Sequence, residues 1–153
     1  MGVWERRWFM VLNAWMRVLL RSPFHRLRSS RVVLLEFRGR RSGREYRMPV
    51  SYWQPSPDVV VCLTSATWSR WWLNLDGSEV GVWLRGRHRS GRSELITEEE
   101  TRHSLVSGFL KHNAHDAPHY DVETDEQGQP LPAGLDALAD SPDTKVIQIA
   151  LAP

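Results

Sequence analysis

The spacing of hydrophobic and polar residues predicts a chain built mostly from short β-strands. Runs rich in β-branched and aromatic residues, bounded by glycine, proline or polar turns, are typical of strands. Six such runs occur, at residues 31–37, 45–53, 59–65, 80–87, 92–97 and 144–151. The sequence RGRRSGR separates the first two runs and supplies the glycines of a hairpin turn. A looser copy, RGRHRSGR at 85–92, predicts a second arginine-rich hairpin.

Helical periodicity appears at the N-terminus and again before the last strand. Five apolar residues follow one another at spacings of four, three, four and three: Trp4, Trp8, Val11, Trp15 and Val18. This pattern predicts an amphipathic helix over 3–21, ending before Pro23. Its apolar face favours packing on the core, as most such stripes do, and the alternative is that it lies on a membrane surface with arginines at the headgroups.

The remaining segments are assigned by length and polarity. Residues 98–113 carry acidic side chains in their first turn and predict a helix. Residues 69–75 are long enough only for a brief helix, and the polar, Pro- and Gly-containing stretch 121–143 predicts an extended loop.

Together these elements predict a mainly β fold of the α+β class. We expect a six-stranded antiparallel split β-barrel with an N-terminal amphipathic helix and one helix before the last strand. A length of 153 residues favours one domain over 1–153. Its expected parts are the N-terminal helix and connection (1–30), the barrel core (31–97), a helix and loop (98–143) and a closing strand (144–153).

Composition and charge narrow the classes of function. No apolar run is long enough to span a membrane, the N-terminus lacks the pattern of a secretory signal, and one cysteine, Cys62, allows no internal disulfide. A cytoplasmic protein is therefore expected, with Cys62 as buried core. The charge is uneven, since residues 1–50 hold 12 Arg and 3 Glu, a net +9, while the whole chain has only +2. The basic third suits an anionic partner.

The arginine-rich turn at 38–44 is the first candidate site. Two arginines beside Ser-Gly can present guanidinium groups, a hydroxyl and backbone N–H groups to one phosphate. The alternative is that Gly39 and Gly43 serve only the backbone and the arginines are solvated. Trp68, Trp71 and Trp72 lie close by in sequence, and one of them could stack on a ring system instead of packing in the core.

Other chemistry has less support in the sequence. His112, His115 and His119 have a spacing that superficially resembles a metal site, but Pro118 interrupts the helical register and no further ligand completes the set, so no metal is expected. Nucleophile-elbow, Walker, dinucleotide-binding and HExxH motifs are not found in the sequence.

The stretch LLEFRGRRSGREYRMPVSYW, followed by a strand ending in Thr-Ser, then WWLNL and VGVWLRGR, resembles the deazaflavin-dependent nitroreductase and quinone reductase family. The resemblance covers about residues 31–97 and implies an FMN-binding-like split barrel that uses the deazaflavin coenzyme F-420. It also implies a set of coenzyme-binding residues: Arg40, Arg41, Ser42 and Gly43 for the phosphate-bearing tail, Met48, Pro49 and Val50 along the ring, and Thr64, Ser65, Trp71 and Asn74 beside it.

This resemblance implies an oxidoreductase that passes a hydride to a small electron acceptor such as a quinone or nitro compound. Ser51, Tyr52 and Tyr120 are the candidate proton donors. FMN is the alternative cofactor within the same fold, and a non-catalytic lipid-binding or membrane-surface module is the alternative from another class. A homodimer, and peripheral contact with the inner face of the membrane through residues 3–21, are further expectations. Nucleic acid is not an expected partner, because regular interleaving of aromatic and basic residues is missing.

Overall fold

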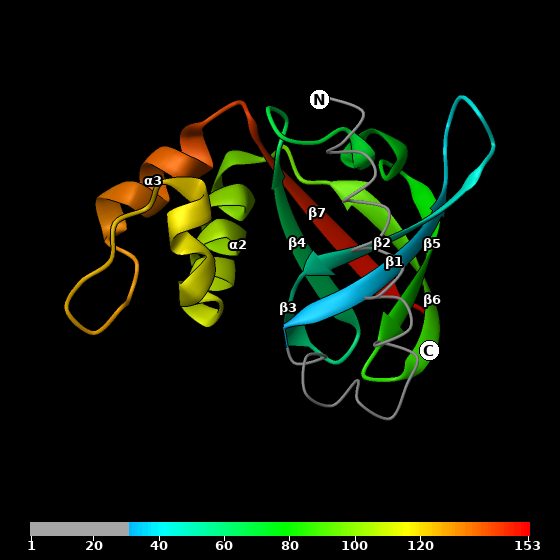
Figure 1. The fold of residues 1–153 in the computed structure, drawn as a ribbon, viewed down its shortest axis with the longest axis horizontal. Helices are drawn as coiled ribbons and strands as arrows, with labels where there is room; N and C mark the ends of the chain where they lie inside the picture. Colours follow the sequence, from blue (N-terminus) through cyan, green and yellow to red (C-terminus); the bar gives the residue numbers. More distant parts are fainter. Residues whose placement is uncertain (1–30) are drawn as a thin grey trace, which may run out of the picture.

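A computed structural model describes residues 31–153, which form one curled antiparallel sheet with helices against one end of it (Figure 1). The strands are β1 (Val32–Arg38), β2 (Glu45–Ser51), β3 (Trp53–Ser56), β4 (Val59–Ser65), β5 (Ser78–Leu84), β6 (Arg87–Leu95) and β7 (Thr144–Leu151). Their order across the sheet is β2-β1-β5-β6-β7-β4-β3. The predicted N-terminal helix at 3–21 lies outside the described residues.

The sheet curls because consecutive strands occupy its two opposite edges. β2 ends at Ser51 and β3 begins at Trp53, yet β2 pairs with β1 while β3 pairs with β4. Tyr52 alone joins them: its backbone N–H donates to the Arg31 carbonyl at 3.2 Å and its carbonyl accepts from Asn113 Nδ2 at 2.9 Å. A single linking residue brings the two edges together and bends the sheet into a half-barrel.

Alternating residues from most strands fill the inside of this half-barrel. Because side chains on a strand point to opposite faces in turn, Val33, Leu35 and Phe37 of β1 all point into the same core. Val80 and Val82 of β5 pack against them in the same way. Cys62 is fully buried here, as predicted, and burial raises the pKa of its thiol to about 12.

Two α-helices cover the outer face of the sheet at its β4–β7 end (Figure 1). They are α2 (Glu99–His112) and α3 (Pro132–Asp140), with the 3₁₀ helix η3 (Ala114–Tyr120) between them; a second 3₁₀ helix, η2 (Trp71–Asn74), follows β4. Val106 and Phe109 of α2 and Leu135 of α3 form a second core with Val61 and Val146 of the sheet. Within residues 31–153, no helix is both long and apolar enough to cross a membrane.

Much of the predicted architecture is confirmed. The fold is mainly β and its sheet is antiparallel. β4 and β7 have the predicted bounds, and the helix near 98–113 and the brief helix near 69–75 are both present. The predicted strand count of six is wrong, because the run at 45–53 breaks at Tyr52 into β2 and the start of β3, which continues to Ser56.

Two other predictions are corrected. The stretch 121–143 is not an extended loop, because it contains α3, which begins at Pro132 and buries Leu135 and Ala139 one turn apart. The second arginine-rich hairpin turns earlier than predicted, at Arg85 and Gly86, whose φ angles are 50° and 77°. Positive φ at both central residues suits a two-residue hairpin turn, so residues 87–92 belong to β6.

Candidate functional site

The arginine-rich turn between β1 and β2 is closed by its own hydrogen bonds. The Gly39 N–H donates to the Arg44 carbonyl at 2.8 Å, the Gly43 N–H to the Gly39 carbonyl at 2.9 Å, and the Arg44 N–H to Ser42 Oγ at 3.2 Å. Gly43 has φ +68°, which favours glycine, and a Cβ on Gly39 would lie 2.7 Å from Ser42 Oγ. The glycines thus have structural roles that leave Arg40 and Arg41 exposed at the tip.

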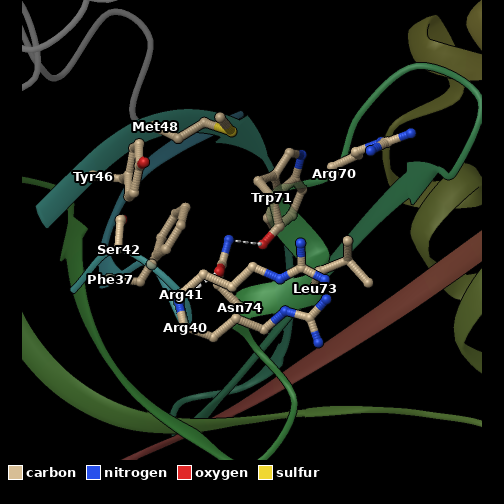
Figure 2. Close-up of a pocket in the computed structure, with 11 residues that line it drawn as sticks. Phe37, Arg40, Arg41, Ser42, Tyr46, Met48, Arg70, Trp71, Leu73 and Asn74 are labelled. Carbon is tan, nitrogen blue, oxygen red and sulfur yellow. Dashed lines mark hydrogen bonds between the residues drawn. The ribbon is translucent and has the colours of Figure 1, made fainter. Parts of the chain in front are cut away.

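Asn74 fixes this turn to η2, across 34 residues of sequence. Its Oδ1 accepts the Arg40 backbone N–H at 2.9 Å, and its Nδ2 donates to the Trp71 carbonyl at 3.2 Å. Figure 2 shows the second of these bonds as a dashed line, with the two arginine side chains extending from the turn across η2 toward Leu73. The two motifs that carry the family resemblance therefore meet in space through one side chain.

A cavity of about 480 Å³ lies between the turn, β2 and η2 (Figure 2). It is lined by Phe37, Gly39, Arg40, Arg41, Ser42, Tyr46, Met48, Arg70, Trp71, Leu73 and Asn74. The lining joins a cationic side, formed by arginines, to an apolar and aromatic side. An elongated ligand with a flat ring at one end and negative charge at the other would match both sides.

The cavity is positively charged. Three arginines, Arg40, Arg41 and Arg70, line it, and its lining contains no Asp or Glu. Elsewhere in the described chain arginines form ion pairs with carboxylates, for example Arg47 with Glu36 at 3.3 Å, whereas these three have no such pair within residues 31–153. Their charge is therefore available to an anionic ligand.

Six of the residues implied by the resemblance line this cavity, and five do not. The six are Arg40, Arg41, Ser42, Met48, Trp71 and Asn74. Gly43 shapes the turn itself, and Pro49 and Val50 continue β2 beyond Met48. Thr64 and Ser65 end β4, where Thr64 Oγ1 lies 2.7 Å from Ser69 Oγ and Ser65 Oγ accepts the Thr67 N–H at 3.2 Å. They organise the loop that leads to Arg70.

The three candidate proton donors lie outside the residues that line the cavity. Tyr52 is buried in the core, and burial raises the pKa of its phenol. Tyr120 donates its hydroxyl proton to the Leu63 carbonyl at 3.1 Å, and burial, followed by the nearby Asp116 charge, raises its pKa further. Ser51 is half-buried at the end of β2. Among the residues that line the cavity, those with a hydroxyl group are Ser42 and Tyr46.

Five residues of the lining were not among the predicted site residues: Phe37, Gly39, Tyr46, Arg70 and Leu73. Tyr46 was predictable, because it lies two residues before Met48 on β2 and therefore on the same face. It stacks on Phe37 with ring centroids 5.8 Å apart. Arg70 directly precedes η2, and its position depends on how the preceding loop folds, which sequence periodicity does not report.

A second hollow, of about 680 Å³, shares Phe37 and Tyr46 with the arginine-lined cavity. Its charged residues largely pair with each other: Glu36 faces Arg47 at 3.3 Å and His88 Nε2 at 3.6 Å, and Arg38 faces Glu45 at 3.4 Å. This mutual pairing leaves less net charge for a ligand than in the arginine-lined cavity, which is therefore the candidate site.

Comparison with solved structures shows the fold. The chain is similar to a protein related to general stress protein 26 from Clostridium acetobutylicum, of the pyridoxinephosphate oxidase family (TM-score 0.54, 13% identity, 87% of this chain and 83% of that one). It is also similar to an F-420-H2-dependent reductase (TM-score 0.50, 15% identity, 77% and 92%). A third similar structure is a 5-nitroimidazole resistance protein, so described provisionally, from Bacteroides thetaiotaomicron (TM-score 0.50, 12% identity, 90% and 78%).

These neighbours share the split-barrel fold of the pyridoxamine phosphate oxidase type, and at such low identities the likeness shows the fold alone. No protein-family model matches the chain, and no curated protein matches it.

Proposed function

We propose that the protein is an oxidoreductase that binds the deazaflavin coenzyme F-420 in the arginine-lined cavity and passes a hydride to an electron-poor acceptor. The observation that carries this proposal is the cavity lining: Arg40, Arg41 and Arg70 stand beside Trp71 and share the cavity with no carboxylate. The neighbouring F-420-H2-dependent reductase, which has the same fold, supports the choice of coenzyme.

The donor set fits such a coenzyme at both ends. One guanidinium group can donate two parallel hydrogen bonds to two oxygens of a phosphate, and the Ser42 hydroxyl adds a further donor at the same turn. The Trp71 ring and the Met48 side chain offer flat or polarisable apolar surface to a ring system. The coenzyme would therefore lie with its phosphate-bearing tail at the turn and its ring toward β2.

When bound, the coenzyme supplies the hydride, and a quinone or nitro acceptor takes up that hydride together with one proton. The protein's residues hold the tail, orient the ring and shield one of its faces. For the proton, Tyr46 is better placed than the three donors chosen from sequence, because its ring lines the cavity while Tyr120 is engaged with a backbone carbonyl. Substituting Tyr46 by Phe tests this role.

FMN is the second candidate cofactor, because it also combines a flat ring with a phosphate and would use the same arginines. The two cofactors differ in the length of the charged tail beyond the first phosphate. F-420 has the longer charged tail, so we expect its binding to depend more on Arg70, on the η2 side of the cavity, than the binding of FMN does.

Titrating the purified protein with each cofactor and following tryptophan fluorescence tests the proposal, because Trp71 lines the cavity and would be quenched. Charged hydrogen bonds contribute about 1.5–3 kcal/mol where water is partly excluded. Substituting both Arg40 and Arg41 by Ala should therefore weaken coenzyme affinity by at least about tenfold, which corresponds to 1.4 kcal/mol.

The matched control replaces Arg87 and Arg92 by Ala. Both are exposed, both lie on β6, and neither lines the cavity, so this variant loses the same charge elsewhere. Arg89 is unsuitable, because its guanidinium donates to the carbonyls of Pro57 and Ala152 and holds the structure together. Equal weakening in both double variants would mean a long-range charge effect. Preference for FMN would change the cofactor, and binding of neither would reject the proposal.

We also propose that the protein works as a homodimer at the inner face of the cytoplasmic membrane, reached through residues 3–21. The sequence supports the membrane contact, because an amphipathic, tryptophan-rich stripe suits a membrane interface and a membrane surface would supply quinone acceptors. The homodimer is tested by light scattering of the purified protein, and a monomer at working concentration would exclude it.

A further inference from the structure

A cluster of metal-binding side chains lies between α2 and α3, away from the residues that line the arginine-lined cavity. Glu99 and His103 are one turn apart on α2, and Asp136 and Asp140 are one turn apart on α3. Residues four apart on a helix share a face. The two helices share one core, to which α2 contributes Val106 and α3 contributes Leu135, and they lie side by side (Figure 1). The ion pairs of His103 with Asp136 and Asp140 show that these polar faces meet.

The side-chain atoms of this cluster are already close. The ligand atoms of Glu99, His103 and Asp140 all lie within 4.8 Å of one another, the only such group of three among residues 31–153. His103 Nε2 is 2.6 Å from Asp140 Oδ1. In a tetrahedral zinc site with bonds of about 2.0–2.2 Å, two ligand atoms lie roughly 3.4 Å apart. Glu99 and Asp140 are exposed, so side-chain rotations can bring Glu99 closer and move Asp140 Oδ1 away from His103 Nε2 to reach this spacing.

The backbone beneath the cluster is held in place by an unrelated set of bonds. Arg102, next to His103, donates to the carbonyls of Ala139 and Ser141 at 2.9 and 3.1 Å, on either side of Asp140. At the other end, the Glu98 carboxylate accepts backbone N–H groups of the first turn of α2, which carries Glu99. The positions of the ligating residues are therefore fixed before any ion binds, which lowers the cost of binding.

We propose that Glu99, His103 and Asp140 form a binding site for one divalent transition-metal ion, with Zn²⁺ as the best match, that joins α2 to α3. One imidazole nitrogen and two carboxylate oxygens are ligands that Zn²⁺ accepts, whereas Mg²⁺ and Ca²⁺ prefer oxygen alone. The remaining coordination position faces solvent and is open to water.

Asp136 orients the His103 ring without binding the metal itself. Its Oδ1 lies 3.5 Å from His103 Nδ1, on the side of the ring opposite Nε2. Metal-bound histidines are commonly held in this way, with the second nitrogen bonded to a carboxylate that sets the tautomer and the ring direction. The same arrangement without metal is an imidazole bridging two aspartates, so the ion would take the place of the proton between Nε2 and Asp140.

Isothermal titration of the intact, chelator-treated protein with ZnCl₂ tests the proposal. We expect one Zn²⁺ per chain, with a rise in Tm on saturation, and no displacement by excess MgCl₂. His103→Gln and Asp140→Asn should each weaken binding by more than tenfold. Asp136→Asn should weaken binding roughly 10- to 100-fold, as is typical when a residue that hydrogen-bonds to a metal ligand is substituted. Glu100→Gln, an exposed acid in the same turn of α2, should leave it unchanged.

Two outcomes overturn the proposal. One is a titration of the wild-type protein with no stoichiometric binding. The other is unchanged Zn²⁺ affinity in both His103→Gln and Asp140→Asn, which would place the ion elsewhere, for instance on His112, His115 and His119. The asparagine variant keeps the size and hydrogen-bonding ability of Asp140, and its Tm without metal reports whether it is folded.

Discussion

The bridge formed by Asn74 predicts a specific defect when this side chain is shortened. Asn74→Ala removes both the acceptor for the Arg40 N–H and the donor to the Trp71 carbonyl. A neutral hydrogen bond contributes about 0.5–1.5 kcal/mol net. Because Asn74 is only half-buried and water can replace part of each bond, we expect the turn to lose about 1–2 kcal/mol of local stability.

Hydrogen exchange at single amides measures this loss directly. The Arg40 amide is bonded to Asn74 Oδ1, so its exchange should become roughly five- to thirtyfold faster in Asn74→Ala, as 1–2 kcal/mol implies. Ser42→Ala is the matched control, because it removes the Ser42 bond to the Arg44 amide within the same turn and leaves the bridge intact. Unchanged exchange at Arg40 in Asn74→Ala would refute the bridge.

Three further predictions concern other parts of the chain. Gly108→Ala should destabilise the protein by about 1–3 kcal/mol in urea unfolding, since a Cβ there would lie 2.2 Å from the Trp53 ring. Glu98→Gln should lower Tm at neutral pH. Hydrogen bonds from the Thr101 side chain, and then from the backbone N–H groups of Thr101 and Glu100, lower the pKa of Glu98. The stabilisation from this carboxylate is therefore complete above about pH 4.5 and is lost as pH falls through its folded pKa, and an equal Tm difference at pH 7 and in acid would contradict this. Deleting residues 1–21 should weaken co-sedimentation with anionic vesicles, and unchanged sedimentation would argue against membrane contact.

The sequence predicted those parts of the fold that local pattern controls. β4 begins with five consecutive apolar residues, and β7 has apolar residues on both sides of Gln148, because both faces of these strands are largely buried, one inside the half-barrel and one under the helices. Their bounds were therefore clear. β2 and β3 gave one continuous strand-like run, and the break at Tyr52 depends on pairing with two distant strands. Pairing across the sheet leaves no local signal at the residue where the chain changes partner.

The helix α3 was missed for a different reason. Its segment is surrounded by Pro, Gly and acidic residues typical of a loop, and its apolar stripe is short. Two helix signals were present, since Pro132 is a favourable first residue of a helix and the apolar Leu135 and Ala139 lie four residues apart. These signals are weak alone, because so short a helix is stabilised mainly by packing against the core that it shares with α2. Because α3 was predicted as a loop, the cluster around His103 could not be anticipated either.

For the candidate site, the sequence identified the cationic side better than the aromatic one. Arg40, Arg41 and Ser42 lie in a motif of adjacent residues, so their proximity follows from the chain itself. Tyr46 and Arg70 reach the same cavity only because β2 pairs with β1 and because Asn74 holds the turn against η2. The cavity is thus assembled by one polar side chain acting between two motifs. Any loosening of that bridge should separate the arginines from Trp71 and weaken recognition of a ligand's tail and ring together, more than recognition of either alone.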